Sequence, residues 1–373
     1  MIARTTSRSH EVIATADEAF MRRALDLAML GMNTTTPNPR VGSVVVRDGH
    51  IVGEGFHARA GEAHAEVRAL ADARTKGHDA RGATLYVTLE PCNHVGRTPA
   101  CTEALLASGV SRVVVGARDP NPVACGGVER LRAAGIAVST GVLEEQAREL
   151  NRGFVKRMTS GMPWVRSKIA ASIDGRTALY AGASQWITGP QARADGHAWR
   201  ARACAVMTGV GTVLQDDPQL DVREVATSRQ PLRIVVDRNA DTPPAARVLR
   251  DGAVLVVTNG AHNPSWPQHV QTLGMPDDAE RVDLAAMMRE LARREINEVH
   301  VEAGARLNAA LLRASLIDEL VVYLAPAVLG DPARGMFQYA EPLASLAQRV
   351  ELSWHSIDRV GEDLRIVARV AGR

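Results

Sequence analysis

The pattern of apolar and polar positions predicts alternating helices and strands in the first part of the chain. Apolar residues recur at helical spacing over residues 18–30, directly after Asp17, which we expect to cap that helix. Two apolar segments flank Asp48-Gly49, a dipeptide typical of a hairpin turn. The other elements expected here are strands 84–89 and 111–115 and helices 63–73, 99–107 and 128–134. This pattern, which continues to about residue 142, predicts an α/β domain with an initial hairpin.

A second α/β pattern begins after a break. Residues 143–158 are polar, basic and helical in character, and Thr159 to Pro163 interrupt the pattern, so we expect domains at 17–158 and 162–373. The strands expected in the second domain lie near 164–171, 203–207, 232–236, 253–257, 298–302, 320–324, 350–354 and 364–370. The helices expected there lie near 191–202, 284–294 and 305–313. Residues 258–276, rich in Asn, Gly and Pro, are expected to form a loop.

Composition limits the classes of protein that fit this pattern. The chain has 373 residues, of which 46% are hydrophobic, and its formal net charge is only +2, which does not favour a nucleic-acid partner or an anionic membrane surface. Neither a membrane-spanning segment nor a signal peptide is evident, so we expect a cytoplasmic protein whose partner is a small molecule. A homo-oligomer is left open. Four cysteines are too few for a disulfide framework, so clustered ones are interpreted as ligands or catalysts.

One constellation predicts zinc chemistry. His64-Ala65-Glu66 stands at the start of an expected helix, and Cys92 and Cys101 follow a buried strand. One imidazole and two thiolates suit a catalytic zinc that keeps its fourth position for water, and such zinc lowers the pKa of that water. A carboxylate outside the ligand set must then move protons, and Glu66 is the candidate. The order H-x-E, then P-C and a second cysteine, is the signature of zinc-dependent base deaminases, although the cysteines here are nine residues apart.

Plainer interpretations of the same residues exist. An isolated His-x-Glu pair is common, and two cysteines nine apart are more often core residues than ligands, but their occurrence together, in this order and after a buried strand, favours zinc deaminase chemistry. His94 could also complete a structural site with four protein ligands and no catalysis. Cys125 and Cys204 have no such neighbours and are interpreted as small buried side chains.

The second domain shows weaker chemical signals. No G-x-G-x-x-G follows a strand, which argues against a standard Rossmann domain. Strand alternation places Lys168 and Asp174 on one polar face that ends at a turn, Asp174 to Arg176. Gly304 stands between an expected strand and helix, where backbone N–H groups can approach a phosphate.

These motifs resemble the RibD-type bifunctional enzymes of riboflavin biosynthesis, which join a pyrimidine deaminase to a pyrimidine reductase. The resemblance covers nearly the whole chain. The motifs that carry it are Thr36 to Gly42, His57 to Glu66, Cys92 to Cys101, Asp119 to Pro122, Lys168 to Arg176, Ser184 to Thr188, Asp216 to Pro218 and Val301 to Gly304. It implies a cytidine-deaminase-like three-layer domain followed by a dihydrofolate-reductase-like α/β domain, with Zn²⁺ and NADPH as cofactors.

The resemblance also implies roles for individual residues. His64, Cys92 and Cys101 would hold zinc, Glu66 would relay protons, and Asn38 and His57 would hold the pyrimidine. The residues expected to contact NADPH are Ala170, Trp186, Thr212, Asp216, Gly304, Ala305, Arg306, Leu307, Asn308, Ala309 and Ala310. The residues expected to contact the reductase substrate are Lys168, Ser184, Arg200, Leu220, Arg223 and Glu302. Arg97 is a candidate partner for the substrate phosphate at the deaminase site, and a solvated loop arginine is an equal interpretation.

The sequence departs from the family pattern at a few positions, including Ser43, Ala100 and Cys125-Gly126, and none of them is a proposed ligand. The function expected is zinc-dependent deamination of a diamino-pyrimidinone ribosyl phosphate, followed by NADPH-dependent reduction of the ribosyl group to ribityl. The alternative is a monofunctional zinc nucleobase deaminase with an appended, non-catalytic nucleotide-binding domain.

Overall fold

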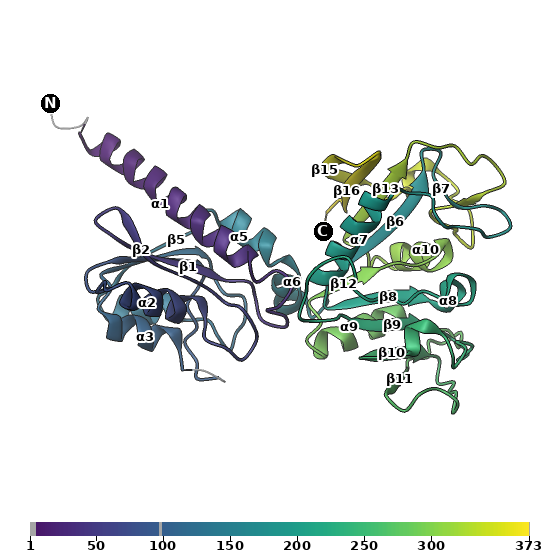
Figure 1. Ribbon diagram of the computed structural model, residues 1–373, viewed down its shortest axis with the longest axis horizontal. Helices are drawn as coiled ribbons and strands as arrows, with labels where there is room; N and C mark the ends of the chain where they lie inside the picture. Colours follow the sequence, from purple (N-terminus) through teal and green to yellow (C-terminus); the bar gives the residue numbers. More distant parts are fainter. Residues whose placement is uncertain (1–4, 97–98, 373) are drawn as a thin grey trace. The chain divides into compact units, whose positions relative to one another are not determined.

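The computed structural model describes residues 5–96 and 99–372 and divides into two compact units, residues 1–160 and 161–373 (Figure 1). The expected domain boundary after residue 158 lies two residues from this division. Within the described residues, no helix is both long enough and apolar enough to pass through a lipid bilayer.

The first unit is built on a five-stranded sheet in the order β2-β1-β3-β4-β5. Its strands are β1 (Gly42–Arg47), β2 (His50–Phe56), β3 (Thr84–Leu89), β4 (Arg112–Ala117) and β5 (Ala137–Thr140). Its helices are α1 (Thr5–Met29), α2 (Ala65–Thr75), α3 (Cys101–Ser108), α4 (Gly127–Ala133), α5 (Glu144–Leu150) and α6 (Arg152–Ser160). The β1–β2 hairpin is antiparallel and turns at Asp48-Gly49, both with positive φ, as the dipeptide predicted.

Helices cover both faces of this sheet, which gives the three layers expected (Figure 1). Alternate residues of β1 point to opposite faces: Val45 packs among side chains of α2 to α4, whereas Val44 packs against α1. Gly42 permits the close approach of α1, because a Cβ at this position would lie 1.9 Å from the carbonyl oxygen of Ala24.

The expected helix cap at Asp17 is wrong. Helix α1 begins at Thr5, so Asp17 lies inside it. Its buried carboxylate instead accepts hydrogen bonds from Tyr86 Oη at 2.8 Å and from both terminal nitrogens of Arg112 at 2.9 and 2.7 Å. A residue that is a good cap by type is here a buried partner for two side chains of the sheet.

The second unit is built on a nine-stranded sheet in the order β11-β10-β9-β8-β12-β6-β13-β16-β15. Its strands are β6 (Trp164–Ser172), β8 (Ala205–Gly209), β9 (Leu232–Val236), β10 (Val254–Thr258), β11 (Val270–Gly274), β12 (Glu298–Val301), β13 (Glu319–Ala325), β15 (Leu352–Val360) and β16 (Asp363–Val370). A small separate sheet pairs β7 (Arg176–Ala178) with β14 (Arg334–Gly335). The helices are α7 (Pro190–Arg202), α8 (Val210–Asp216), α9 (Leu284–Arg293) and α10 (Ala305–Arg313), with short 3₁₀ turns η1 (Arg247–Leu249) and η2 (Leu346–Gln348).

The strands from β11 to β13 are parallel, and the last two form an antiparallel C-terminal hairpin, as expected. Helices α9 and α10 pack on one face of the sheet, where Met287 and Leu311 meet Met207 and Val299 of the strands. Helix α7 packs on the other face, against Tyr323 and its neighbours.

Four local expectations are corrected by the structure. Strand β11 lies inside the segment expected to be a loop, where it adds an edge to the sheet and remains largely exposed. The helical stretch expected at 143–158 is two helices that meet at Asn151. Pro99 precedes α3, so Cys101 is the first residue of that helix. Cys125 is exposed, whereas Cys204 is buried as expected.

Candidate active sites

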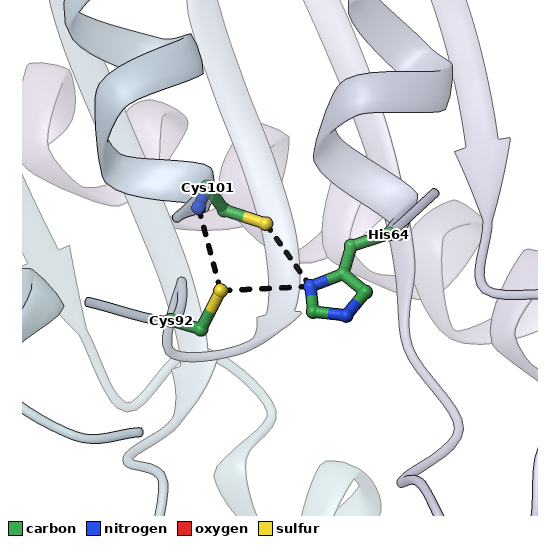
Figure 2. Close-up of side chains that lie close together, drawn as sticks. All are labelled: His64, Cys92 and Cys101. Atoms are coloured by element: carbon green, nitrogen blue, oxygen red, sulfur yellow. Dashed lines mark hydrogen bonds between the residues drawn. The ribbon is translucent and has the colours of Figure 1, made fainter. Parts of the chain in front are cut away.

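Three side chains that are far apart in the sequence come together in the first unit. Figure 2 shows His64, directly before α2, facing Cys92, which follows β3, and Cys101, at the first position of α3. His64 Nδ1 lies 3.2 Å from Cys101 Sγ and 3.5 Å from Cys92 Sγ, and the three potential ligand atoms all lie within 4.8 Å of one another. One imidazole and two thiolates at this spacing fit a tetrahedral zinc ion, with the fourth position open.

The surroundings favour a thiolate at Cys92. Hydrogen bonding from the Cys101 thiol and from His64 lowers the pKa of Cys92 well below its ordinary value, and the Cys101 backbone N–H donates to Cys92 Sγ at 3.3 Å. Glu66, on the first turn of α2, is only 3% exposed, and burial raises its pKa to about 7. A carboxyl group that titrates near neutral pH can both take up and release a proton during a reaction.

Asn38 and His57 lie beside this cluster. Burial lowers the pKa of His57 to about 4, so its ring is neutral at pH 7. The ring Nδ1–H donates to the carbonyl of Ala63 at 3.3 Å, which leaves Nε2 to accept from Asn38 Nδ2 at 3.0 Å. The centroids of the His57 and His64 rings are 5.1 Å apart. The structure therefore brings together the six residues predicted for the first site.

The sequence offered two further candidates for this site, His94 and Arg97. Among the described residues, the metal-binding cluster contains His64, Cys92 and Cys101 but not His94, so this arrangement does not favour the structural zinc site with His94 as fourth ligand. Arg97, the candidate phosphate partner, lies outside the described residues.

Sequence reasoning missed Glu90, a buried residue that holds the loop next to the metal cluster. This carboxylate is 3% exposed and accepts hydrogen bonds from the backbone N–H groups of Asp119, Gly126 and Val128 at 3.1–3.2 Å. It thereby fixes residues 119–128, whose Ala124 carbonyl accepts a hydrogen bond from the backbone of Asn93, next to Cys92. A glutamate just after a buried strand was the available signal.

In the second unit, three charged side chains meet at the carboxyl end of β12, next to the middle of β6. Lys168 Nζ lies 3.9 Å from Glu302 Oε2, and Arg200 of α7 donates to the same carboxylate from Nη2 at 2.9 Å and from Nε. Arg200 Nη1 also donates to the carbonyl of Asp221 at 2.9 Å, which ties the segment bearing Leu220 and Arg223 to this group. The carboxyl ends of parallel strands are the usual place for a ligand in such a sheet.

Burial and these contacts shift the pKa of each group. Burial lowers the pKa of Lys168, and the nearby Glu302 partly offsets this effect. Burial would raise the pKa of Glu302, but Arg200 and Lys168 hold it well below its ordinary value. His300, which sequence reasoning did not single out, is fully buried with its Nε2 3.5 Å from Glu302 Oε1, and burial lowers its pKa.

The start of α10 adjoins α8. Gly304 is the residue before α10, and a Cβ placed on it would lie 3.7 Å from Thr212 Oγ1. Asn308 and Ala309 are only 1% and 2% exposed, and the Asn308 side chain binds Ser167 and the carbonyl of Ala303. The other residues predicted here are Ala305, Arg306, Leu307 and Ala310, none of which is fully buried.

The remaining predicted residues of the second unit have varied surroundings. Ser184 Oγ donates to Asp216 Oδ1 at 2.9 Å, which joins a predicted substrate residue to a predicted cofactor residue. Trp186 is 69% exposed, with the Arg193 guanidinium over its ring. Ala170 is half-buried on β6, Leu220 is buried, and Arg223 pairs with Asp221 at the surface.

Comparisons with known proteins match both units. The family described as the RibD C-terminal domain matches residues 163–366, and the cytidine and deoxycytidylate deaminase zinc-binding region matches residues 14–117. The riboflavin biosynthesis protein RibD of Escherichia coli K12 is 47% identical over 93% of this chain and 98% of its own length.

Solved structures agree over almost the whole chain. RibD of Acinetobacter baumannii superposes with a TM-score of 0.89 and 41% identity, and covers 96% of this chain and 99% of that one. A diaminohydroxyphosphoribosylaminopyrimidine deaminase/5-amino-6-(5-phosphoribosylamino)uracil reductase of Thermotoga maritima gives a TM-score of 0.88 at 37% identity, with the same coverage. Because matches of this identity span both the zinc-cluster unit and the Lys168–Glu302 unit, the chain belongs to the RibD family of bifunctional deaminase–reductases of riboflavin biosynthesis.

Proposed function

We propose that the two reactions of this enzyme use separate sets of residues, one in a deaminase domain at 17–158 and one in a reductase domain at 162–373. The enzyme deaminates a diamino-pyrimidinone ribosyl phosphate and reduces the ribosyl group of the product to ribityl, with Zn²⁺ and NADPH as cofactors. The observation that carries the assignment is the convergence of His64, Cys92 and Cys101.

In the deaminase domain, His64, Cys92 and Cys101 hold the zinc ion. A zinc ion held by these residues would activate water for attack on the amino-bearing ring carbon. Asn38 and His57 hold the pyrimidine, and Glu66 moves protons to the ring and to the departing ammonia. The position of Glu66 supports this role, because it lies on the first turn of α2, two residues after His64, and is almost fully buried beside the cluster without being one of its ligands.

In the reductase domain, NADPH supplies the hydride and the chain supplies its position. We assign the cofactor to the start of α10 with Ala170, Trp186, Thr212 and Asp216. Gly304 leaves room for a phosphate at the helix start, where backbone N–H groups point outward. Within the helix, the buried side chains of Asn308 and Ala309 act by supporting the helix.

The reductase substrate is assigned to the charged group of Lys168, Arg200 and Glu302 at the carboxyl end of β12. Lys168 and Arg200 together carry two positive charges against the single negative charge of Glu302, so the group has an excess of one positive charge. That excess suits a phosphorylated substrate. Ser184, Leu220 and Arg223 complete the proposed contacts.

The zinc assignment is tested by metal content and ammonia release in the same variants. Cys92→Ser and Cys101→Ser should lose both zinc and deamination, since each removes a ligand. Glu66→Gln should keep about one zinc per chain and lose about 10²–10⁴-fold in turnover, because it removes a proton carrier and no ligand. Loss of zinc from Glu66→Gln would show that Glu66 is misassigned.

We also propose that the enzyme is a homo-oligomer in which a second copy covers the C-terminal hairpin. Strand β15 is the edge of the nine-stranded sheet, and the hairpin exposes Leu352, Trp354, Ile357 and Leu364, by 40%, 69%, 58% and 42%. The register pairs Ile357 with Ile366 and Trp354 with Ala368, which places these apolar side chains on one face. An apolar face beside an open strand edge can pack against the same surface of a second copy across a two-fold axis. The cytoplasmic location stays a prediction from the sequence.

A further inference from the structure

The segment that carries Asn38, residues 30–41, belongs to no helix or strand. It joins α1 to β1, so no ladder of hydrogen bonds defines its shape. Asn38 is nevertheless held 3.0 Å from His57 Nε2, beside the metal cluster. An irregular segment keeps such a position only through individual contacts with better-ordered parts of the protein.

One side chain provides two of these contacts from a distant part of the sequence. Asn151 lies 111 residues after Arg40 and is 2% exposed. Its Oδ1 accepts from the backbone N–H of Arg40 at 2.7 Å, and its Nδ2 donates to the backbone carbonyl of Arg40 at 2.8 Å. The amide thus pairs with both polar backbone groups of one residue, as a neighbouring strand would.

The Arg40 side chain makes two further hydrogen bonds, one to α5 and one within the segment itself. Its Nη1 donates to the carbonyl of Leu150 at 2.9 Å, and its Nε donates to the carbonyl of Met32 at 3.2 Å. Met32 and Arg40 lie on opposite sides of Asn38 in the sequence. Arg40 therefore closes the segment into a loop and ties it to the residue before Asn151.

Asn151 is held in place by two helices that are packed against the sheet. It joins α5 to α6, and Ala147 and Phe154 on these helices pack in one buried cluster with Leu89 and Ala117. Leu89 ends β3, the strand that leads to Cys92. The support of the Asn38 segment and the support of a proposed zinc ligand therefore share one packed cluster.

We propose that Asn151 is a positioning residue of the deaminase site, which holds residues 30–41 so that Asn38 meets the substrate at a fixed distance from the metal cluster. This inference rests on the proposed role of Asn38 in holding the pyrimidine. Asn151 acts through the Arg40 backbone and does not itself contact the substrate. An amide is needed because one donor and one acceptor must be presented together.

The test compares Asn151→Ala and Asn151→Asp in the full-length enzyme. Alanine removes both hydrogen bonds, while aspartate keeps the acceptor and turns a second oxygen toward the Arg40 carbonyl. For both, the KM of deamination should rise about tenfold or more while kcat changes less than about threefold, as expected when binding and not chemistry is impaired. Zinc content and reduction of supplied deaminated substrate should match the parent enzyme, which provides an internal control for folding.

A matched control is Tyr86→Phe, which removes a buried hydrogen bond to Asp17 in the same unit but away from residues 30–41. It should leave the KM of deamination unchanged. If Tyr86→Phe and the Asn151 variants raise KM equally, Asn151 has only a structural role and the inference is wrong.

A double-mutant cycle with Asn38→Ala separates this inference from the role of Asn38. If Asn151 acts through Asn38, the double variant should be no worse than Asn38→Ala alone. A normal KM in Asn38→Ala would overturn the role of Asn38 and, with it, the positioning role. A raised KM in Asn38→Ala with a normal KM in both Asn151 variants would overturn the positioning role alone.

Hydrogen exchange gives a readout that does not depend on activity. The Arg40 amide is protected by Asn151 Oδ1, so its exchange in Asn151→Ala should accelerate about tenfold or more, while amides of β3 keep their parent rates. Unchanged exchange at Arg40 would mean that the segment is held without Asn151 and would refute the inference.

Discussion

Arg200 and Glu302, which are 102 residues apart, form a bidentate ion pair at the carboxyl end of β12, in which Nε and Nη2 of the guanidinium each donate to one carboxylate oxygen. Each side chain is largely buried, and Lys168 faces the same carboxylate. The pair therefore has two functions that can be separated: it neutralises buried charge, and it orients a guanidinium next to the proposed substrate site.

Removal of one partner should destabilise the second unit. Glu302→Ala leaves Arg200 and Lys168 buried without their anion, and we expect the free energy of unfolding to fall by about 3–5 kcal/mol. In the double variant Arg200→Leu/Glu302→Leu, only part of this loss should be regained, because Lys168 still lacks its anion, and reduction should remain abolished. Denaturant unfolding and an NADPH oxidation assay measure the two effects. A double variant that regained activity would show that the pair has no role in the reaction.

The alkaline limit of reduction should depend on Lys168. Burial lowers the pKa of its ammonium group, and Glu302 partly offsets that shift, so the charge is lost below the ordinary lysine range. Reduction should fall as the ammonium deprotonates. Glu302→Gln removes the opposing carboxylate and should move the alkaline limb of kcat/KM to lower pH. Lys168→Arg should abolish the limb, because a guanidinium stays charged.

The effect of Lys168 on stability has a definite sign. The folded state binds this proton less tightly than the unfolded chain does. Stability should therefore rise with pH between the lowered pKa and the ordinary value of 10.5.

The kinetic prediction has its own contrary outcome. If the alkaline limb of kcat/KM for reduction stays at one pH in the parent, Glu302→Gln and Lys168→Arg enzymes, a group other than Lys168 controls it.

Gly304→Ala should weaken NADPH binding without disturbing the fold. Gly304 has φ −74°, which any residue can adopt, and an added Cβ makes only an ordinary contact with Thr212. A methyl group would however hold a phosphate away from the helix start, so the Kd for NADPH should rise about tenfold. Fluorescence titration measures this Kd. Gly335→Ala, where an added Cβ meets nothing within 4 Å, is the control.

The sequence predicted the elements with strong periodicity and the residues with strong chemistry. Strands β3 and β9 and helix α10 have the expected bounds, because each is a short apolar or amphipathic run between clear turn residues. The metal cluster was predicted because His-x-Glu, Pro-Cys and a second cysteine occur together in the order typical of zinc-dependent base deaminases, although each pair alone is common. Asn151, Glu90 and His300 were missed, since their importance comes from partners brought close by folding, and Asp17 was misinterpreted for the same reason.

The C-terminal hairpin should control the oligomeric state. Trp354→Glu or Ile357→Lys places a charge on the exposed apolar face and should convert the oligomer to a monomer, since burial of an unpaired charge in an interface is costly. Val328→Glu, at a residue 72% exposed outside the hairpin, should leave the assembly unchanged. Sedimentation velocity distinguishes these outcomes. A parent enzyme that is monomeric at all concentrations would show that no second copy covers the hairpin.

The two activities should be separable by single substitutions. The proposed residues of the two sites lie in different compact units, residues 1–160 and 161–373, and each unit has its own sheet and hydrophobic core. His64→Ala should therefore abolish ammonia release, because it removes a zinc ligand, while reduction of supplied deaminated substrate stays within about twofold of the parent rate. Lys168→Ala should do the converse. Each variant is assayed with each substrate, and circular dichroism confirms that it is folded. If a folded His64→Ala enzyme cannot reduce supplied intermediate, the two reactions depend on one composite site, and the assignment of independent domains is wrong.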